Sequence, residues 1–505
     1  MRPNVAAALH RGSILFFGAA GYAPDEAAAM LRGGAGLSTL ARFGAAAALA
    51  AAAEARTPRF ASPLALRRYT EALQLSARAE AACCGEGGAG TGDAPAMLVA
   101  LEEARSLLLG GGEGRSPAWC AVLGRVIAAG CAQLRRQGEH SASARALCDT
   151  IGHSMMPQRW RAALFVQCVK DLDRAGQHER ACRLCEAAHT SHLDANGHLS
   201  SASVASLLES SGGGSSPEAL KLGAVQLMAV RRVLKKLAVP PRRWKKPALP
   251  SLAAPREVHL RGDEVLEGGD AGRRLGWRAA DGSIARGVEE YVRLHYLSGA
   301  WSKGVHLENA LFLSLFALLM WDALFAPLPG AFGSSSSDAP DDLLSGCGSF
   351  ASRRADIVGA LLKRIESAAP DEQLDGTVPQ ETPVASPRAH LSLSARLAAA
   401  HAAHYGEECI GLDWSRLDLP LLQWTATALG GRVVAAICRA LADDYGGFSH
   451  GAPDLLLLAD RPSAAARFVE VKGPNDRLSD SQVAWCDVLA RAGADVEVAY
   501  VERCV

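Results

Sequence analysis

Three charged residues near the C-terminus have the types and spacing that metal-assisted phosphodiester cleavage requires. Asp454 follows a proline, and Glu470 and Lys472 stand two positions apart further along the chain. In an extended strand alternate side chains share a face, so Glu470 and Lys472 point the same way. Two carboxylates can hold a divalent cation, and a lysine beside them can orient water or neutralise charge on phosphorus. These residues form the candidate catalytic group, with Mg2+ or Mn2+ as the expected cofactor.

A structural explanation of the same residues remains open at this point. Short patterns of Asp, Glu and Lys arise often in a chain of 505 residues. A solvated strand edge that carries an ion pair would produce the same spacing, because exposed charges of opposite sign commonly pair on a strand. Taken alone, a PD dipeptide followed by ExK is therefore a weak indication of catalysis.

The elements around these residues can be read from the local pattern. Leu455–Leu458 is a short apolar run bounded by turn residues, and Phe468–Lys472 reads as a second strand. Ser479 can cap a helix over Asp480–Arg491, which a glycine ends. Alternating apolar residues then predict a strand over 496–500. The expected order is strand, strand, helix, strand.

The longer string resembles the nuclease domain of the Fanconi-associated nuclease family, the VRR-NUC branch of the PD-(D/E)xK superfamily. It reads GAPD at 451–454 and VEVKGPNDRLSDSQVAW at 469–485. The similarity runs almost without gaps over 451–501 and continues more weakly through 304–325 and 411–445. Ala452 departs from the family pattern, which has leucine there, but it carries no catalytic group.

The resemblance implies further site residues. Asp454 and Glu470, joined by Glu308 and the backbone carbonyl of Val471, would bind one or two metal ions, and Arg477 would lie near the scissile or adjacent phosphate. Glu308 precedes a strongly apolar segment that should be a buried helix, so a carboxylate there needs a partner or a metal. The helix dipole also favours an acidic residue at this position, which leaves a capping role open.

The resemblance also implies the function. It indicates a structure-specific DNA nuclease with 5′-flap endonuclease and 5′-to-3′ exonuclease action, serving interstrand crosslink repair in the nucleus. The expected partners are branched or flapped DNA and ubiquitinated or other DNA-repair proteins. Two alternatives remain: a non-catalytic repair scaffold that binds branched DNA, and a metal-dependent nuclease acting on RNA, since this hydrolysis needs no 2′-hydroxyl.

Composition sets the wider limits. Lys plus Arg equals Asp plus Glu at 53 each, so any DNA-binding surface must be a local patch. The 13 cysteines show no closely spaced framework, which favours free thiols in a reducing compartment. The most apolar stretch, 310–320, is shorter than the roughly 20 residues of a membrane span, and the early sequence does not fit a secretory signal. We expect a soluble protein without a membrane partner.

Successive amphipathic patterns predict a helical, TPR-like region before the nuclease core. The expected division is an alanine-rich N-terminal region over 1–62, interpreted as a candidate degenerate DNA-binding module, the helical region over 63–250, a linker with helices entering the core over 251–410, and the nuclease domain over 411–505. The expected fold class is thus α+β and multidomain, with a C-terminal restriction-endonuclease-like α/β core.

Two features of the helical region bear on binding. A basic run near its end suits phosphate contacts or nuclear import, although a solvated helix face is an equal explanation. The candidate DNA-binding residues in this run are Arg242, Arg243, Lys245 and Lys246. Cys182 and Cys185 form a CxxC inside an expected helix, but no second pair accompanies them, so we interpret them as ordinary helix residues rather than a zinc site.

Overall fold

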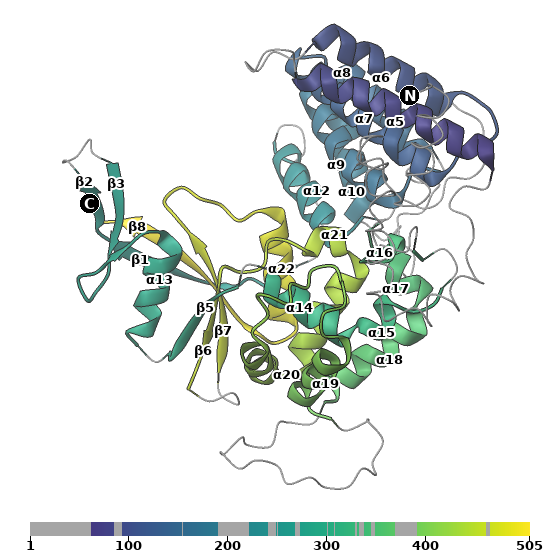
Figure 1. Ribbon diagram of the computed structural model, residues 1–505. Coiled ribbons are helices and arrows are strands. Elements are labelled where there is room, and N and C mark those ends of the chain that lie inside the picture. Colours follow the sequence, from purple (N-terminus) through teal and green to yellow (C-terminus); the bar gives the residue numbers. More distant parts are fainter. Residues whose placement is uncertain are drawn as a thin grey trace. The chain divides into compact units, whose positions relative to one another are not determined.

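The structure is a computed structural model (Figure 1). It describes residues 62–84, 93–153, 155–189, 222–240, 249, 251–267, 273–299, 301–307, 309–328, 331–332, 338–344, 349–368, 391–460 and 465–504. The chain divides into two compact units, Met1–Pro250 with Pro327–Ser349, and Ser251–Ala326 with Phe350–Val505. The N-terminal alanine-rich region, apart from Ser62, lies outside the described residues.

The first unit is helical where it is described. Its helices are α5 (Pro63–Cys84), α6 (Ala94–Leu109), α7 (Pro117–Arg136), α8 (His140–Gly152), α9 (Gln158–Arg174), α10 (His178–His189), α12 (Ala224–Leu237) and the short α16 (Asp341–Leu344). Asp93 and Ser116 cap α6 and α7 by accepting hydrogen bonds from backbone N–H groups of the first turn. Neighbouring helices pack on one another around a single apolar core. The predicted helical region is confirmed.

Burial explains the CxxC in this unit. Cys182 and Cys185 both lie in α10 and are buried in the core, and burial raises the pKa of the Cys185 thiol far above its ordinary value. A buried neutral thiol packs as a small apolar group. Within the described ranges no group of three or more His, Cys, Asp or Glu side chains could hold a metal ion. The pair is therefore part of the core.

The second unit is built on a mixed sheet of five strands in the order β1-β8-β7-β6-β5. The strands are β1 (Arg256–Gly262), β5 (Lys303–His306), β6 (Leu455–Leu458), β7 (Ala466–Lys472) and β8 (Asp495–Arg503). β6 pairs antiparallel with β5 and β7, whereas β8 pairs parallel with β7 and β1. Together with α22 (Asp480–Arg491), this confirms the predicted order of strand, strand, helix, strand.

The two faces of this sheet have different covers (Figure 1). One face packs against α13 (Val288–Leu297) and a three-stranded sheet of β2 (Glu264–Glu267), β3 (Arg273–Arg278) and β4 (Ile284–Ala285). On the other face, Phe312 of α14 (Ala310–Leu319) contacts Phe468 of β7 and Trp485 of α22. These rings are buried, so they fix the helices on the sheet.

Further helices surround α14 in the second unit. They are α15 (Trp321–Leu324), α17 (Ser349–Arg353), α18 (Ala355–Glu366), α19 (Leu393–His404), α20 (Leu419–Asp443) and α21 (Tyr445–Phe448). The helix expected after Glu308 is α14, and it is buried as predicted. α20 is kinked at Gly430, which has a φ of 75°.

The segment over 251–306 contains five strands that the sequence pattern did not predict. β1 alternates charged and apolar residues over Arg256–Gly262, and its partner β8 lies at the other end of the chain. A short strand with exposed charges carries a weak local signal, and its pairing depends on contacts distant in sequence. The expectation of only a linker and helices before the core was therefore incomplete.

Two described helices, α7 and α20, are long and apolar enough to cross a membrane. About half of the most apolar window of each, 50% and 44%, is buried inside the protein. Core helices of water-soluble proteins have the same length and hydropathy, so these properties alone are weak grounds for a membrane span.

Candidate active site

The candidate catalytic residues lie together at the junction of β6 and β7. Leu455 pairs with Val469, so Asp454, which immediately precedes β6, faces the end of β7. The Asp454 Oδ2 atom accepts a hydrogen bond of 2.8 Å from the backbone N–H of Val471. The Lys472 Nζ atom lies 2.6 Å from the Glu470 Oε1 atom. The order of the strands thus assembles three residues that the sequence separates.

Burial makes this group unlike a solvated strand edge. The Glu470 side chain is 1% exposed and the Lys472 side chain 10%. Removal from water, and after it the neighbouring Asp454 charge, raise the pKa of the Glu470 carboxyl to about 8, although Lys472 partly offsets both effects. Burial likewise raises the pKa of Asp454. Two buried carboxyl groups side by side are costly unless a cation joins them.

One carboxylate oxygen of the group has no hydrogen-bond donor among the described residues. Among the described residues nothing hydrogen-bonds the buried Glu470 Oε2 atom. An orphaned carboxylate oxygen beside Asp454 fits a hard divalent cation such as Mg2+ or Mn2+, which prefers oxygen ligands. Glu308, the expected third carboxylate, lies outside the described residues. Its metal role, like the carbonyl role of Val471, stays a prediction.

A tight turn follows β7 and presents Arg477. The Gly473 N–H donates a hydrogen bond of 3.2 Å to Asp476 Oδ2, and Asn475 adopts a positive φ of 70°. Asp476 therefore closes the turn rather than facing a cation. Arg477 is exposed directly after it. An exposed guanidinium on a fixed turn suits contact with a phosphate group.

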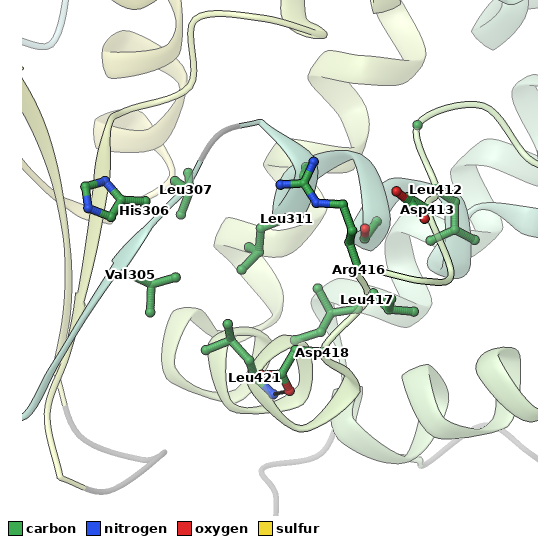
Figure 2. Close-up of a pocket in the computed structure, with 14 residues that line it drawn as sticks. Val305, His306, Leu307, Leu311, Leu412, Asp413, Arg416, Leu417, Asp418 and Leu421 are labelled. Carbon is green, nitrogen blue, oxygen red and sulfur yellow. Dashed lines mark hydrogen bonds between the residues drawn. The ribbon is translucent and has the colours of Figure 1, made fainter.

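A pocket of about 390 Å³ adjoins β5, the strand that pairs with β6. Its wall includes Leu307, whose N–H donates a hydrogen bond of 3.0 Å to the Asp454 carbonyl. Figure 2 shows the Arg416 side chain extending toward the side of the pocket where Leu307 and Leu311 lie. Nothing in the sequence around 411–422 pointed to this pocket, because its walls come from segments far apart in the chain.

The remaining predicted DNA contacts are not placed. Arg242, Arg243, Lys245 and Lys246 lie outside the described residues. The earlier part of the basic run lies on α12, where the Lys236 Nζ atom is 2.9 Å from Asp173 Oδ2. That lysine is engaged within the first unit, which weakens the case for a continuous basic surface along this helix.

A mixed sheet with Asp454, Glu470 and Lys472 gathered on neighbouring strands defines a nuclease domain of the restriction-endonuclease type. Residues 390–503 match the family model of the VRR-NUC domain. Relatives named Fanconi-associated nuclease 1 extend the match. The rice homologue is 33% identical over 281 residues, covering 54% of this chain and 26% of the relative. The human protein is 33% identical over 239 residues, covering 47% and 21%. The resemblance to the Fanconi-associated nuclease family is thereby confirmed, and residues 390–503 form a VRR-NUC domain.

Solved structures share the fold. The structure of paFAN1 bound to 2nt 5′ flap DNA with gap has a TM-score of 0.61 at 20% identity, covering 99% of this chain and 71% of the other. The structure bound to a 1nt 5′ flap has a TM-score of 0.52 at 23% identity, covering 82% and 63%. These matches confirm the predicted fold class, with helical N-terminal and middle regions and a C-terminal α/β core. The matched part of this chain spans about a quarter of the length of the rice and human relatives.

Proposed function

We propose that this protein is a metal-dependent, structure-specific DNA nuclease. The observation that carries the proposal is the buried group of Asp454, Glu470 and Lys472, in which one Glu470 oxygen lacks a described partner. Buried polar atoms are normally hydrogen-bonded, so a Glu470 oxygen that has no described donor and lies beside the second carboxyl group of Asp454 supports a role as a cation ligand. The named nuclease relatives and the flap DNA in the paFAN1 structures support the same function.

Each residue of the group has a distinct task in this proposal. Asp454 and Glu470 would hold the cation, which would polarise the phosphate and lower the pKa of a water molecule. The Val471 N–H fixes the Asp454 carboxylate through its 2.8 Å hydrogen bond. Lys472, held against Glu470, orients the attacking water and neutralises charge that develops on phosphorus. In-line attack then expels the 3′-oxygen and leaves a 5′-phosphate.

The finer assignments rest on the family. We propose 5′-flap endonuclease and 5′-to-3′ exonuclease action in the repair of interstrand crosslinks, in the nucleus. Glu308 would complete the metal site. Arg477 would contact a phosphate, and the basic segment of Arg242, Arg243, Lys245 and Lys246 would add DNA contacts. Ubiquitinated or other repair proteins would recruit the enzyme.

The test compares cleavage of labelled 5′-flap DNA, 3′-flap DNA and matching RNA in Mg2+, Mn2+ and EDTA. Asp454→Asn keeps the shape of the side chain but removes its charge, and Lys472→Ala removes the ammonium. We expect metal-dependent cutting of 5′-flap DNA to fall by at least about 100-fold in both variants. Asp495→Asn is the matched control, since this aspartate pairs with Arg467 2.7 Å away at the start of β7, away from Lys472.

The other outcomes favour different functions. Binding of the flap without cutting in either metal would favour a DNA-repair scaffold and make Glu470 a structural residue. Preferential cutting of RNA would favour a ribonuclease. Equal loss of activity in Asp495→Asn would mean that Asp454→Asn acts through folding, so the catalytic assignment would fail.

A further inference from the structure

Two stacked rings, those of Tyr500 and His259, lie beside the candidate active site on the neighbouring strands β8 and β1. Parallel pairing places Tyr500 of β8 beside Lys472 of β7, and His259 of β1 beside Tyr500. Paired residues on neighbouring strands share a face, so these three side chains form one row on the face that carries Glu470. His259 lies two strand spacings, about 10 Å, from Lys472.

The imidazole of His259 is held in a fixed orientation. Its ring stacks on Tyr500, with 5.2 Å between ring centroids and 20° between the ring planes. Its Nδ1 atom lies 2.7 Å from Glu502 Oε1. The side chain is nevertheless 56% exposed. β1 is an edge strand of the five-stranded sheet, so no described strand of this sheet lies beyond the ring face opposite Tyr500.

The row changes from buried to exposed as it leaves the catalytic group. Lys472 is buried, Tyr500 is partly buried, and His259 is exposed. Burial raises the pKa of the Tyr500 hydroxyl above its ordinary value, and the charges of Glu470 and Lys472 also act on that hydroxyl. The row therefore leads from the buried catalytic group to the exposed imidazole of His259.

The charges of this surface do not favour phosphate. Glu257 and Glu502 lie on the same face of the sheet as His259, and of the cations there Arg261 pairs in register with Glu502. The two carboxylates outnumber the one exposed arginine, which disfavours a phosphate, whereas an uncharged nucleobase would meet an exposed, preorganised ring. Stacking of a base on an aromatic ring is a common way to bind single-stranded nucleic acid and tolerates any sequence.

We propose that His259, supported by Tyr500 and Glu502, is a stacking platform for an unpaired base of the DNA strand next to the bond that is cut. The inference rests on the proposed nuclease function and deepens it, because it names the part of the substrate that this edge of the sheet contacts. Tyr500 is a positioning residue here, since it acts by holding the imidazole.

The experiment measures binding of 5′-flap DNA in EDTA by fluorescence anisotropy, and cutting in Mg2+. His259→Ala removes the ring, and His259→Phe keeps a ring of similar size. His295→Ala is the matched control, because His295 is also exposed and packs edge-on against Tyr296, but it lies on α13 against the opposite face. We expect His259→Ala to weaken binding about 5- to 150-fold, and His259→Phe and His295→Ala to bind nearly as the wild type does.

Two further readouts separate stacking from other roles. 2-Aminopurine placed at successive flap positions should be quenched at one or two positions by the wild type and not by His259→Ala. The slope of log Kd against log salt should stay unchanged in His259→Ala, because no phosphate contact is lost. Circular dichroism and thermal unfolding identify variants that have lost the fold. Tyr500→Phe keeps the ring on which His259 stacks and removes only the hydroxyl.

Each result decides between outcomes. Wild-type affinity in His259→Ala, a smaller salt slope, or a His259→Phe variant as weak as His259→Ala would overturn the stacking role. Wild-type protein that neither binds nor cuts the flap would instead overturn the proposed nuclease function. If the wild type binds and cuts the flap and His259→Ala does so equally well, the stacking role fails and the nuclease assignment stands.

Discussion

Glu470 is the residue whose surroundings most constrain the chemistry. Burial and the neighbouring Asp454 raise its pKa from 4.5 to about 8, so without a cation it is protonated at neutral pH. A folded-state pKa above the ordinary value means that the ionised group lowers folding stability. That cost grows as the pH rises from about 4.5 and is complete above about 8. A bound cation would remove it.

This linkage predicts how metal binding depends on pH. Because a cation must displace the Glu470 proton, affinity for Mn2+ should rise about tenfold per pH unit below pH 8 and level off above it. Calorimetry in two buffers at pH 7 should detect close to one proton released per ion. Glu470→Gln should lose most of the affinity and the pH dependence. Affinity that stays constant between pH 6 and 8 would contradict the assignment.

Arg477 gives a second prediction at the level of the residue. Arg477→Ala should weaken DNA binding and lower the magnitude of the salt slope by about 1, because one phosphate contact is lost. Arg491→Ala is the control, since Arg491 is similarly exposed but pairs with Asp487 2.9 Å away on α22. An equal effect of both substitutions would show that general charge rather than a specific contact is responsible.

Among the elements, α22 links the catalytic strand to the core. Ser479 and Gln482 form a capping box, with hydrogen bonds of 3.2 Å from the Gln482 N–H to Ser479 Oγ and 2.8 Å from the Ser479 N–H to Gln482 Oε1. Trp485 anchors the same helix against Phe312 and Phe448. The cap and the ring contacts together fix the position of the N-terminus of α22, which directly follows the turn that bears Arg477.

The cap can be tested directly. Ser479→Ala should lower the free energy of unfolding of the second unit by about 1 kcal/mol, because it leaves the Gln482 N–H in the first turn unpaired. Ser479→Asp should retain most of the stability, since a carboxylate accepts the same hydrogen bond and favours the helix N-terminus. Denaturant unfolding monitored by tryptophan fluorescence measures both. Equal loss in the two variants would rule out the cap as the cause.

The kink of α20 gives a prediction about packing. Gly430 has a φ of 75° and a ψ of 163°, and a Cβ there would meet open space, so Gly430→Ala should cost only the backbone strain of roughly 1–3 kcal/mol. A Cβ at Gly431 would lie 2.3 Å from the Ile365 carbonyl oxygen of α18. Gly431→Ala should therefore destabilise the second unit more than Gly430→Ala, because it forces α18 and α20 apart. The reverse order, measured by thermal unfolding, would contradict this packing.

At the scale of the whole molecule, the chain forms two units with separate cores. All the described residues of the candidate site belong to the second unit, to which both 251–326 and 350–505 contribute. Leu123 of α7 is buried in the core of the first unit, whereas Leu457 of β6 is buried in the sheet core of the second.

Calorimetry should therefore resolve two unfolding transitions. Leu123→Ala and Leu457→Ala should each lower one transition and leave the other near its wild-type temperature, with a loss of about 2–5 kcal/mol from the affected unit. Only Leu457→Ala should weaken Mn2+ binding at pH 8. A single transition that shifts equally in both variants would show that the units unfold as one.

Local sequence determined much of the C-terminal core and of the first unit. The apolar run at Leu455–Leu458, the cap at Ser479 and the buried helix after Glu308 are signals that a few neighbouring residues carry. Helical periodicity likewise located α5 to α10. The family motif named Asp454, Glu470 and Lys472, because catalytic residue types occur there at a fixed spacing.

Only the tertiary structure decided which distant segments meet. β1 joins β8 across most of the second unit, and this pairing alone places His259 beside Tyr500 and in line with Lys472. The burial that raises the pKa of Glu470 and the pocket walled by Leu307 and Arg416 likewise depend on contacts between remote segments. Residue types and periodicity are local properties, whereas strand order, desolvation and cavities arise from packing, which no short stretch of sequence contains.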